Sequence, residues 1–129
     1  MIVGIGVDSI EISRVVKAME KEHFLHRIFT EREISQLDSG KRRGASDFAG
    51  KEAVVKALGT GFDGIEAGDI EILRNDKGAP YVALQGTAKE YAEKLGIDEW
   101  KISITNTKEL ATAFVVALRG KTDSERGML

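Results

Sequence analysis

Apolar residues along this chain change between the spacing of strands and the spacing of helices. Residues 2–7 are mostly β-branched and interrupted by glycine, which predicts a buried strand that ends at Asp8 and Ser9. From Ser13 onward, apolar positions recur at helical spacing as far as Phe24, and basic residues occupy the opposite side. This pattern predicts an amphipathic helix directly after the first strand.

Capping and turn residues set the bounds of the next elements. Residues 30–33 form a capping box, with a hydroxyl at the cap and a carboxylate three positions later, and predict a short helix that stops near Ser39 and Gly40. Residues 46–58 are rich in alanine and predict the strongest helix of the chain, which ends at the glycines of residues 59–61. Three helices are therefore expected before the second strand.

The remaining apolar runs predict four strands and one helix, in the order strand, strand, helix, strand, strand, over residues 70–73, 81–84, 87–95, 102–105 and 111–118. Turn residues separate the two members of each strand pair, as in hairpins. Because strands and helices do not alternate regularly, the order favours an α+β fold over a doubly wound one. We expect a small single domain over 1–118, with a mainly antiparallel sheet packed against the long helix, and a polar tail over 119–129.

Composition narrows the chemistry that this domain can perform. The 129 residues include two histidines and no cysteine, which excludes a zinc–thiolate site and a cysteine nucleophile and favours hard ions with oxygen ligands. The net charge is −2, yet the segment from Ile10 to Arg43 contains eight basic residues and six acidic ones. This local excess suits an acidic or phosphorylated partner better than nucleic acid, and it also suits ordinary solvated helix faces. No apolar run approaches about 18 residues and no charged leader opens the chain, so we expect a cytoplasmic protein without a membrane partner.

Two carboxylates are candidate ligands of a hard ion. Asp8 follows the first strand, where an aspartate most often serves as a turn or cap residue. Glu52 precedes Lys56 by one helical turn, a spacing typical of a surface ion pair worth about 0.2–0.5 kcal/mol. Glu52 also shares a helical stripe with Phe48 and Val55, so it can instead face inward, where a half-buried carboxylate needs a ligand or an ion. Spacing alone leaves these alternatives open.

The glycines near these carboxylates also have two interpretations each. Gly4 and Gly6 suggest half of a dinucleotide-binding motif, but Ser9 stands in place of its third glycine, so close passage of another backbone explains them better. Residues 59–61 read Gly-Thr-Gly, which most often ends a helix and can also present backbone N–H groups to a phosphate. The helix end is the simpler explanation.

Combined, these segments resemble a known family. Residues 2–8 read IVGIGVD and residues 48–61 read FAGKEAVVKALGTG, and both are similar to motifs of the bacterial holo-[acyl-carrier-protein] synthases, the small 4′-phosphopantetheinyl transferases. Later segments match further landmarks of the family at residues 69–72, 78–80 and 103–105. The resemblance covers essentially the whole chain and implies the same α+β architecture.

The resemblance implies an enzyme of fatty acid biosynthesis. Members transfer the phosphopantetheine arm of coenzyme A to a serine of apo acyl carrier protein and release adenosine 3′,5′-bisphosphate, with magnesium as the usual ion. By position, Asp8 and Glu52 would be the protein ligands of Mg2+, and Lys56 would contact a phosphate oxygen or help the leaving group. Mg2+ keeps several waters and takes carboxylates and substrate phosphates as ligands, which suits this pair. A metal-bound water and Glu52 are the candidates for the base that takes the serine proton.

The resemblance also implies where coenzyme A binds, and two positions depart from the family pattern. Many members have a histidine at the position of Asn106, which cannot carry charge or a proton near neutral pH, and a basic residue at the position of Asp47. A phosphate contact from the second position would have to come from elsewhere, with Arg42 and Arg43 as candidates. The implied coenzyme A-binding set is Arg42, Arg43, Lys56, Gly59, Thr60, Gly61, Pro80, Asn106 and Thr107.

Partners follow from the same resemblance. Acyl carrier proteins are strongly acidic, and family members dock them on basic residues of the first helix, whose counterparts here are Arg14, Lys17, Lys21 and Arg27. Family members are typically homotrimers with active sites shared between neighbouring subunits. A non-catalytic subunit that retains the coenzyme A pocket is the alternative that Asn106 and Asp47 leave open.

Overall fold

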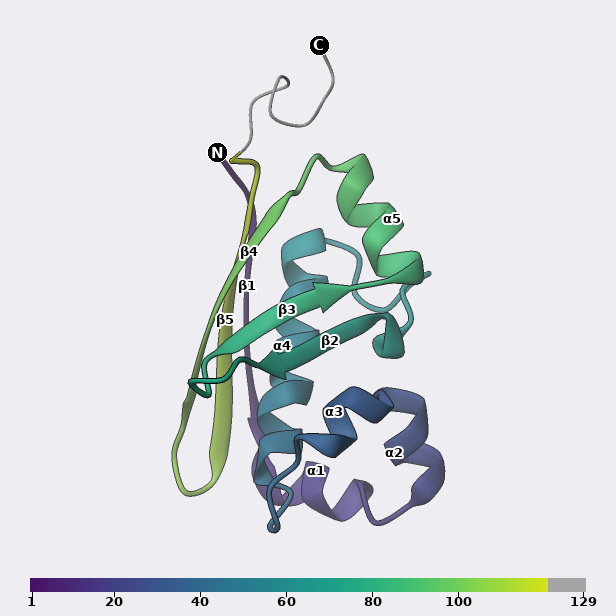
Figure 1. Cartoon of the computed structure of the whole chain (residues 1–129), viewed down its shortest axis with the longest axis vertical. Helices are drawn as coiled ribbons and strands as arrows, with labels where there is room; N and C mark the ends of the chain where they lie inside the picture. The colour runs from purple at the N-terminus through teal and green to yellow at the C-terminus, as the bar shows by residue number, and fades with distance from the viewer. Residues whose placement is uncertain (121–129) are drawn as a thin grey trace.

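Two antiparallel sheets and one long helix organise the computed structural model of the protein, which describes residues 1–120 (Figure 1). The elements in chain order are β1 (Ile2–Glu11), α1 (Ile12–Ala18), α2 (Glu22–Ile28), α3 (Glu31–Ser35), α4 (Arg42–Leu58), the 3-10 helix η1 (Ala67–Asp69), β2 (Ile70–Arg74), β3 (Pro80–Leu84), α5 (Gly86–Lys94), β4 (Glu99–Asn106) and β5 (Leu110–Leu118). The α+β prediction is confirmed. Residues 121–129, most of the predicted polar tail, lie outside the described residues.

The long helix α4 lies between the two sheets. β5 is the central strand of the larger sheet, in the order β1-β5-β4, and β2 pairs with β3 as a separate hairpin. α4 contacts β1 and β5 on one side and β2 on the other, while α1, α2 and α3 gather at one end of the molecule and α5 at the other (Figure 1). The main core fills the space along α4, with buried members that include Ala53, Val54, Ile70, Ile72, Ala113 and Val115.

Two glycines of β1 allow α4 to approach the sheet closely. A Cβ atom on Gly4 would overlap the carbonyl oxygen of Ala57, and one on Gly6 would overlap that of Ala53. Close passage of a second backbone, expected from the sequence, is therefore the reason for these glycines. The contact also holds β1 in register with the helix that carries Glu52.

The first strand is longer than predicted. Antiparallel pairing with β5 continues past Asp8, which lies opposite Ala113, as far as Glu11. The hydroxyls of Ser9 and Thr112 approach to 2.8 Å across the two strands and replace the turn expected at this point. Asp8 is thus a strand residue, and the prediction that it ends the strand is wrong.

The helical region before α4 is also divided differently from the prediction. The helix expected from Ser13 through Phe24 is two helices, because the chain becomes extended at Lys21 before α2 begins. The capping box at Thr30 is confirmed, but α3 ends at Ser35.

The long helix begins before its predicted start. α4 begins at Arg42 rather than Ser46, where the Asp38 carboxylate accepts a 2.9 Å hydrogen bond from the backbone N–H of Arg43. This added turn brings Arg42 and Arg43 onto the helix, beside the end of β4.

The outer face of the larger sheet carries exposed apolar side chains. Ile5, Val7 and Phe114 are 60%, 53% and 44% exposed, and Val7 lies directly opposite Phe114 in the pairing of β1 with β5. No helix within residues 1–120 is long and apolar enough to cross a bilayer. Exposed apolar patches on folded proteins are typical of surfaces that interact with another molecule.

Candidate active site

A polar contact between β1 and α4 joins the two sequence motifs. The Lys56 Nζ atom lies 3.0 Å from Asp8 Oδ1 and donates a second hydrogen bond, also 3.0 Å long, to the carbonyl of Val7. Alternation along β1 turns Asp8 toward α4, on the same side as Gly6. Its second carboxylate oxygen, Oδ2, is buried and has no hydrogen-bond partner among residues 1–120. A buried charged oxygen without a partner is costly, so this one is suited to receive a ligand.

Glu52 lies close enough to Asp8 to feel its charge. Burial raises the pKa of the half-buried Glu52 carboxyl, and the Asp8 carboxylate raises it further, while the Lys56 ammonium lowers it. The Lys56 ammonium pairs with Asp8 across to β1, so Glu52 and Lys56 are more than a surface pair along one helix. Two carboxylates that repel each other favour a cation between them. The structure therefore brings Asp8, Glu52 and Lys56 together.

This pair of carboxylates fits a magnesium ion that is completed by a substrate. In residues 1–120, no group of three or more His, Cys, Asp or Glu side chains could hold a metal ion. Mg2+ needs fewer protein ligands than that, since it retains waters and binds one or two carboxylates together with substrate phosphates. The unpartnered Oδ2 of Asp8 fits such a site, and the contribution of the Asp8 charge to the raised pKa of Glu52 shows that the two carboxylates are neighbours.

The Gly-Thr-Gly segment ends α4 one turn beyond Lys56. Gly59 adopts a left-handed conformation with φ 80°, and the N–H groups of Gly59 and Thr60 both donate to the carbonyl of Val55. Gly61 is also left-handed, with φ 59°. The helix-end interpretation is confirmed, and the segment follows the helix end that carries Lys56.

Several other predicted coenzyme A residues line a separate pocket. This pocket has a volume of about 370 Å³ and is lined by α4, β2, β4, the start of β3 and the turn before it, with contributions that include Arg42, Arg43, Ser46, Arg74, Pro80 and Asn106. Asn106 Nδ2 donates a 2.7 Å hydrogen bond to Ser46 Oγ. Thr107 contributes through its backbone, since its carbonyl accepts a 3.0 Å hydrogen bond from Arg42.

The two groups of predicted residues lie at opposite edges of the sheet. Asp8 belongs to β1 and Asn106 to β4, and β5 separates these strands. Arg42 is the first residue of α4 and Gly59 follows its last, and this helix of 17 residues is about 25 Å long. The structure therefore does not gather all the predicted coenzyme A residues in one place on a single chain.

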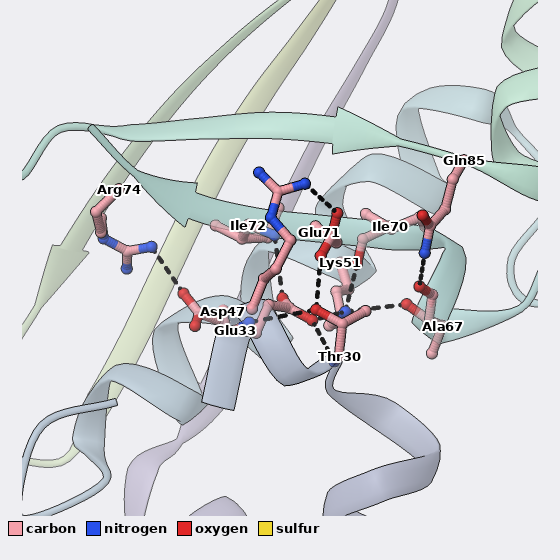
Figure 2. A network of polar contacts seen from close by, with 12 residues as sticks. Thr30, Glu33, Asp47, Lys51, Ala67, Ile70, Glu71, Ile72, Arg74 and Gln85 are labelled. Atoms are coloured by element: carbon pink, nitrogen blue, oxygen red, sulfur yellow. Dashed lines mark hydrogen bonds and ion pairs between the residues drawn. The ribbon is translucent and has the colours of Figure 1, made fainter. Parts of the chain in front are cut away.

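A buried ion pair that the sequence does not predict involves Lys51, the neighbour of Glu52 in the chain. The Lys51 Nζ atom lies 2.7 Å from Glu33 Oε1 and also donates to the carbonyls of Ala67 and Ile70, while Glu33 Oε2 accepts a 3.0 Å hydrogen bond from the N–H of Ile72 (Figure 2). Burial raises the pKa of Glu33 and lowers the pKa of Lys51, and their mutual attraction opposes both shifts. The capping box identified Glu33 only as a helix-capping residue, and nothing in the pattern around Lys51 distinguished it from a surface lysine.

Two of the basic residues of the first helices, Arg14 and Arg27, each border a hollow in the surface. Arg14 borders one hollow together with Phe24 and Phe48, and Arg27 borders a second one together with Phe48 and Glu52. Phe48 lies between the two hollows and packs edge-on against Phe24. Lys17 and Lys21 are exposed at the same end of the molecule.

Comparison with known proteins supplies the family. A family model described as the 4′-phosphopantetheinyl transferase superfamily matches residues 4–115. This chain belongs to that superfamily. The resemblance found in the two sequence motifs is thereby confirmed over nearly the whole described domain.

Individual members of the superfamily are similar over their full length. A holo-[acyl-carrier-protein] synthase of Lachnoclostridium phytofermentans is 53% identical over 116 residues, which cover 90% of this chain and 95% of that protein. The crystal structure of a holo-[acyl-carrier-protein] synthase from Neisseria meningitidis is 31% identical and superposes with a TM-score of 0.83, over 92% of this chain and 99% of that one. The Helicobacter pylori synthase, solved in complex with coenzyme A, is 32% identical with a TM-score of 0.76, over 88% and 99%.

Proposed function

We propose that this protein is a holo-[acyl-carrier-protein] synthase, which transfers the 4′-phosphopantetheine group of coenzyme A to a serine of apo acyl carrier protein. The observation that carries the proposal is the meeting of Asp8 and Glu52, from two motifs 44 positions apart, in a chain 53% identical to a relative of that name. The products are holo acyl carrier protein and adenosine 3′,5′-bisphosphate. A role in fatty acid biosynthesis follows from the carrier.

The reaction is a phosphoryl transfer between two oxygens. The serine oxygen forms a bond to the phosphorus that bears the pantetheine arm, and the bond from that phosphorus to the bridging pyrophosphate oxygen breaks. Asp8 and Glu52 would hold Mg2+, and the ion would neutralise charge on the pyrophosphate. A metal-bound water and Glu52 are the candidates for the group that takes the serine proton, and the raised pKa of Glu52 favours proton acceptance by its carboxylate.

Lys56 can contact the substrate while it remains paired with Asp8. Its side chain is 52% exposed, so its ammonium can reach a phosphate oxygen without leaving Asp8. Gly59, Thr60 and Gly61 follow on the same side of the helix end and line the path of the nucleotide. These residues form one half of the coenzyme A site.

We propose that the other half comes from a neighbouring subunit of a homotrimer. The family resemblance implies a shared active site, and Arg42, Arg43, Pro80 and Asn106 line a pocket at the β4 edge of the sheet, apart from Asp8 and from the Gly-Thr-Gly segment. The exposed apolar face with Val7 and Phe114 supports association of copies.

Carrier docking is assigned to the basic face beside the two hollows that share Phe48. Arg14, Lys17, Lys21 and Arg27 are all exposed, and Arg27 shares a hollow with Glu52. An acidic carrier bound there would present its serine toward the proposed metal site. We place the enzyme in the cytoplasm, as a single catalytic domain over 1–118, which contains the whole family match.

The direct test is to mix the protein with coenzyme A, Mg2+ and an apo acyl carrier protein and to weigh the carrier. A mass increase of one phosphopantetheine group supports the synthase. Binding of coenzyme A without transfer supports the alternative, a non-catalytic subunit that retains the pocket. Absence of both contradicts the proposal.

A further inference from the structure

We propose that Arg74 binds the ribose 3′-phosphate of coenzyme A and that the buried Asp47 carboxylate holds its guanidinium in place for this contact. The inference rests on the proposed function and deepens it, since it concerns the pocket at the β4 edge of the sheet. Neither residue is among those expected from the sequence to bind coenzyme A.

Asp47 and Arg74 form an ion pair at the inner wall of this pocket. Arg74 Nη1 donates a 2.8 Å hydrogen bond to Asp47 Oδ1, and the side chains are 10% and 1% exposed (Figure 2). Arginine has five N–H donors, and within residues 1–120 the guanidinium bonds to Asp47 alone. The pair therefore anchors the cation and leaves donors for a ligand in the pocket that Arg74 lines.

The backbone around Arg74 is fixed as firmly as its side chain. The Gln36 side chain accepts a 2.8 Å hydrogen bond from the N–H of Arg74 and donates a 3.2 Å bond to its carbonyl. The carbonyl of Gln36 accepts a 2.8 Å bond from Arg43 Nη1. One residue of the segment after α3 thus holds two arginines of the pocket, so the site is formed before any ligand binds.

The charge in this pocket matches a phosphate monoester. Arg42, Arg43 and Arg74 line it, whereas the Asp38 carboxylate is engaged with the N–H of Arg43 and Asp47 lies behind Arg74. Guanidinium groups are the usual partners of phosphate because they offer paired donors in one plane.

Coenzyme A has one phosphate that fits. Its pyrophosphate is assigned to the site of Asp8 and Glu52, which leaves the dianionic 3′-phosphate on the ribose. Pro80 and Ile104 supply apolar surface in the same pocket for the adjoining adenine.

The ion pair also accounts for the unusual acidic residue in the second motif. Where many family members place a basic side chain, this chain places Asp47, and the cation comes from β2 instead. Arg42 is less suited to replace it, because its guanidinium already donates to the carbonyls of Thr107 and Lys108. The pocket thus keeps a phosphate-binding cation, Arg74, and the carboxylate at position 47 anchors it.

The test compares the affinity of two ligands that differ only in this phosphate. Dissociation constants for coenzyme A and 3′-dephospho-coenzyme A are measured by calorimetry on the wild type and on Arg74→Met, which keeps much of the side-chain volume. We expect Arg74→Met to weaken coenzyme A at least tenfold and dephospho-coenzyme A less than twofold. The control is Arg32→Met, which removes an exposed arginine paired with Glu71 outside the pocket and leaves both constants unchanged.

A second variant keeps the test valid if the buried Asp47 destabilises Arg74→Met. Asp47→Asn combined with Arg74→Met removes both charges, which is better tolerated than removing one. In this variant too, the preference for coenzyme A over 3′-dephospho-coenzyme A is expected to disappear. This inference alone is overturned if the wild type completes transfer and the variants still bind coenzyme A more tightly than 3′-dephospho-coenzyme A by the full wild-type ratio. A wild type that binds neither ligand overturns the proposed function and this inference with it.

Discussion

At the scale of single residues, burial increases the proton affinity of three carboxyl groups. Burial raises the pKa of Glu33, of Asp47 and of Glu52. Arg74 opposes this effect at Asp47 but does not cancel it, and the pKa of Asp47 rises from 3.8 to about 7. All three groups are therefore more easily protonated in the folded protein than in the unfolded chain.

We predict that Asp47 makes the fold less stable as the pH rises. The folded state binds its proton more tightly, so the stability it contributes is complete below about pH 4 and is lost as the pH rises through about 7. Relative to Asp47→Asn, the free energy of unfolding of the wild type is expected to fall by about 1–3 kcal/mol between pH 5 and pH 8. Urea unfolding at both pH values measures this difference, and a rise instead of a fall would show that the Arg74 ion pair dominates.

The candidate site residues in the two motifs were predictable from the sequence, because the residue types and their order in these motifs are distinctive. Asp8, Glu52 and Lys56 were singled out in this way, and the structure brings them together. The partner of Asp47 was not predictable, because Arg74 lies 27 positions away on a strand whose register no local pattern reveals. Lys51 was missed for the same reason: its burial depends on Glu33, which another helix supplies.

At the scale of elements, the buried Lys51–Glu33 pair ties α3 and β2 to α4. Lys51 on α4 reaches Glu33 on α3, and both bond to the backbone of β2, through Ile70 and Ile72. Lys51 is the neighbour of Glu52 in the chain, so this junction fixes the segment of α4 that carries the proposed metal ligand.

We predict that breaking this pair on one side is more damaging than removing it entirely. Lys51→Met leaves Glu33 buried without its cation, which costs about 3–5 kcal/mol when the partner of a buried charge is lost. Lys51→Met combined with Glu33→Gln removes both charges and is expected to be more stable than Lys51→Met alone. Denaturant unfolding of the two variants and the wild type measures the order, and the reverse order would contradict the role assigned to the pair.

We predict that the basic face of α1 determines affinity for the carrier. Arg14→Glu reverses an exposed charge, so the KM for apo carrier is expected to rise while affinity for coenzyme A is retained. Added salt is expected to reduce the advantage of the wild type, because exposed charges are screened within about 8–10 Å. The control, Lys89→Glu, makes the same charge change on α5 at the other end of the molecule. An unchanged carrier KM, or an equal loss of coenzyme A binding, would exclude docking on α1.

The ends of a helix or strand were predictable where local capping or turn residues set them. They were not predictable where pairing with a distant strand set them. The hairpin of β2 and β3, α5, and the end of α4 at Gly59 agree with the sequence pattern. The extension of β1 past Asp8 depends on pairing with β5, 99 to 103 residues later in the chain, and no local signal reports that pairing.

At the scale of the whole molecule, the fold separates the two halves of the proposed coenzyme A site. β1 and β4 are the two edges of one sheet, and the residues expected to bind a single coenzyme A lie on both. The family match over residues 4–115 could be anticipated from two motifs, because their residues are distinctive. Both motifs come from the segments that pack β1 against α4. The separation of the halves could not, because it depends on strand order.

We predict that disrupting the exposed apolar face lowers both the oligomeric state and the activity. Phe114→Glu places a charge opposite Val7 on this face, so the assembled protein is expected to dissociate toward monomers and to lose most transfer activity. Leu95→Glu, at an exposed apolar residue after α5, serves as the control. Light scattering and carrier mass are measured on the same samples, and a monomer with full activity would exclude a shared site.

The central claim is that Asp8 and Glu52 together hold the ion that transfer requires. Glu52→Gln keeps the shape of the side chain and removes the charge, and Asp8→Asn does the same on β1. If the carboxylates formed only a surface pair, the change would cost about 0.2–0.5 kcal/mol of stability and activity would survive. Each factor of ten in rate corresponds to about 1.4 kcal/mol, so loss of the ion site is a far larger effect.

The most direct measurement is the mass of the carrier after reaction with each variant at limiting Mg2+. Each single variant is expected to melt at nearly the wild-type temperature and to transfer phosphopantetheine at least ~100-fold more slowly, with partial recovery at high Mg2+. The two losses are not expected to add in the double variant, because either one disables the same site. Glu93→Gln, at an exposed position of α5, is expected to transfer at the wild-type rate. Transfer at that rate by Glu52→Gln or by Asp8→Asn would contradict the account.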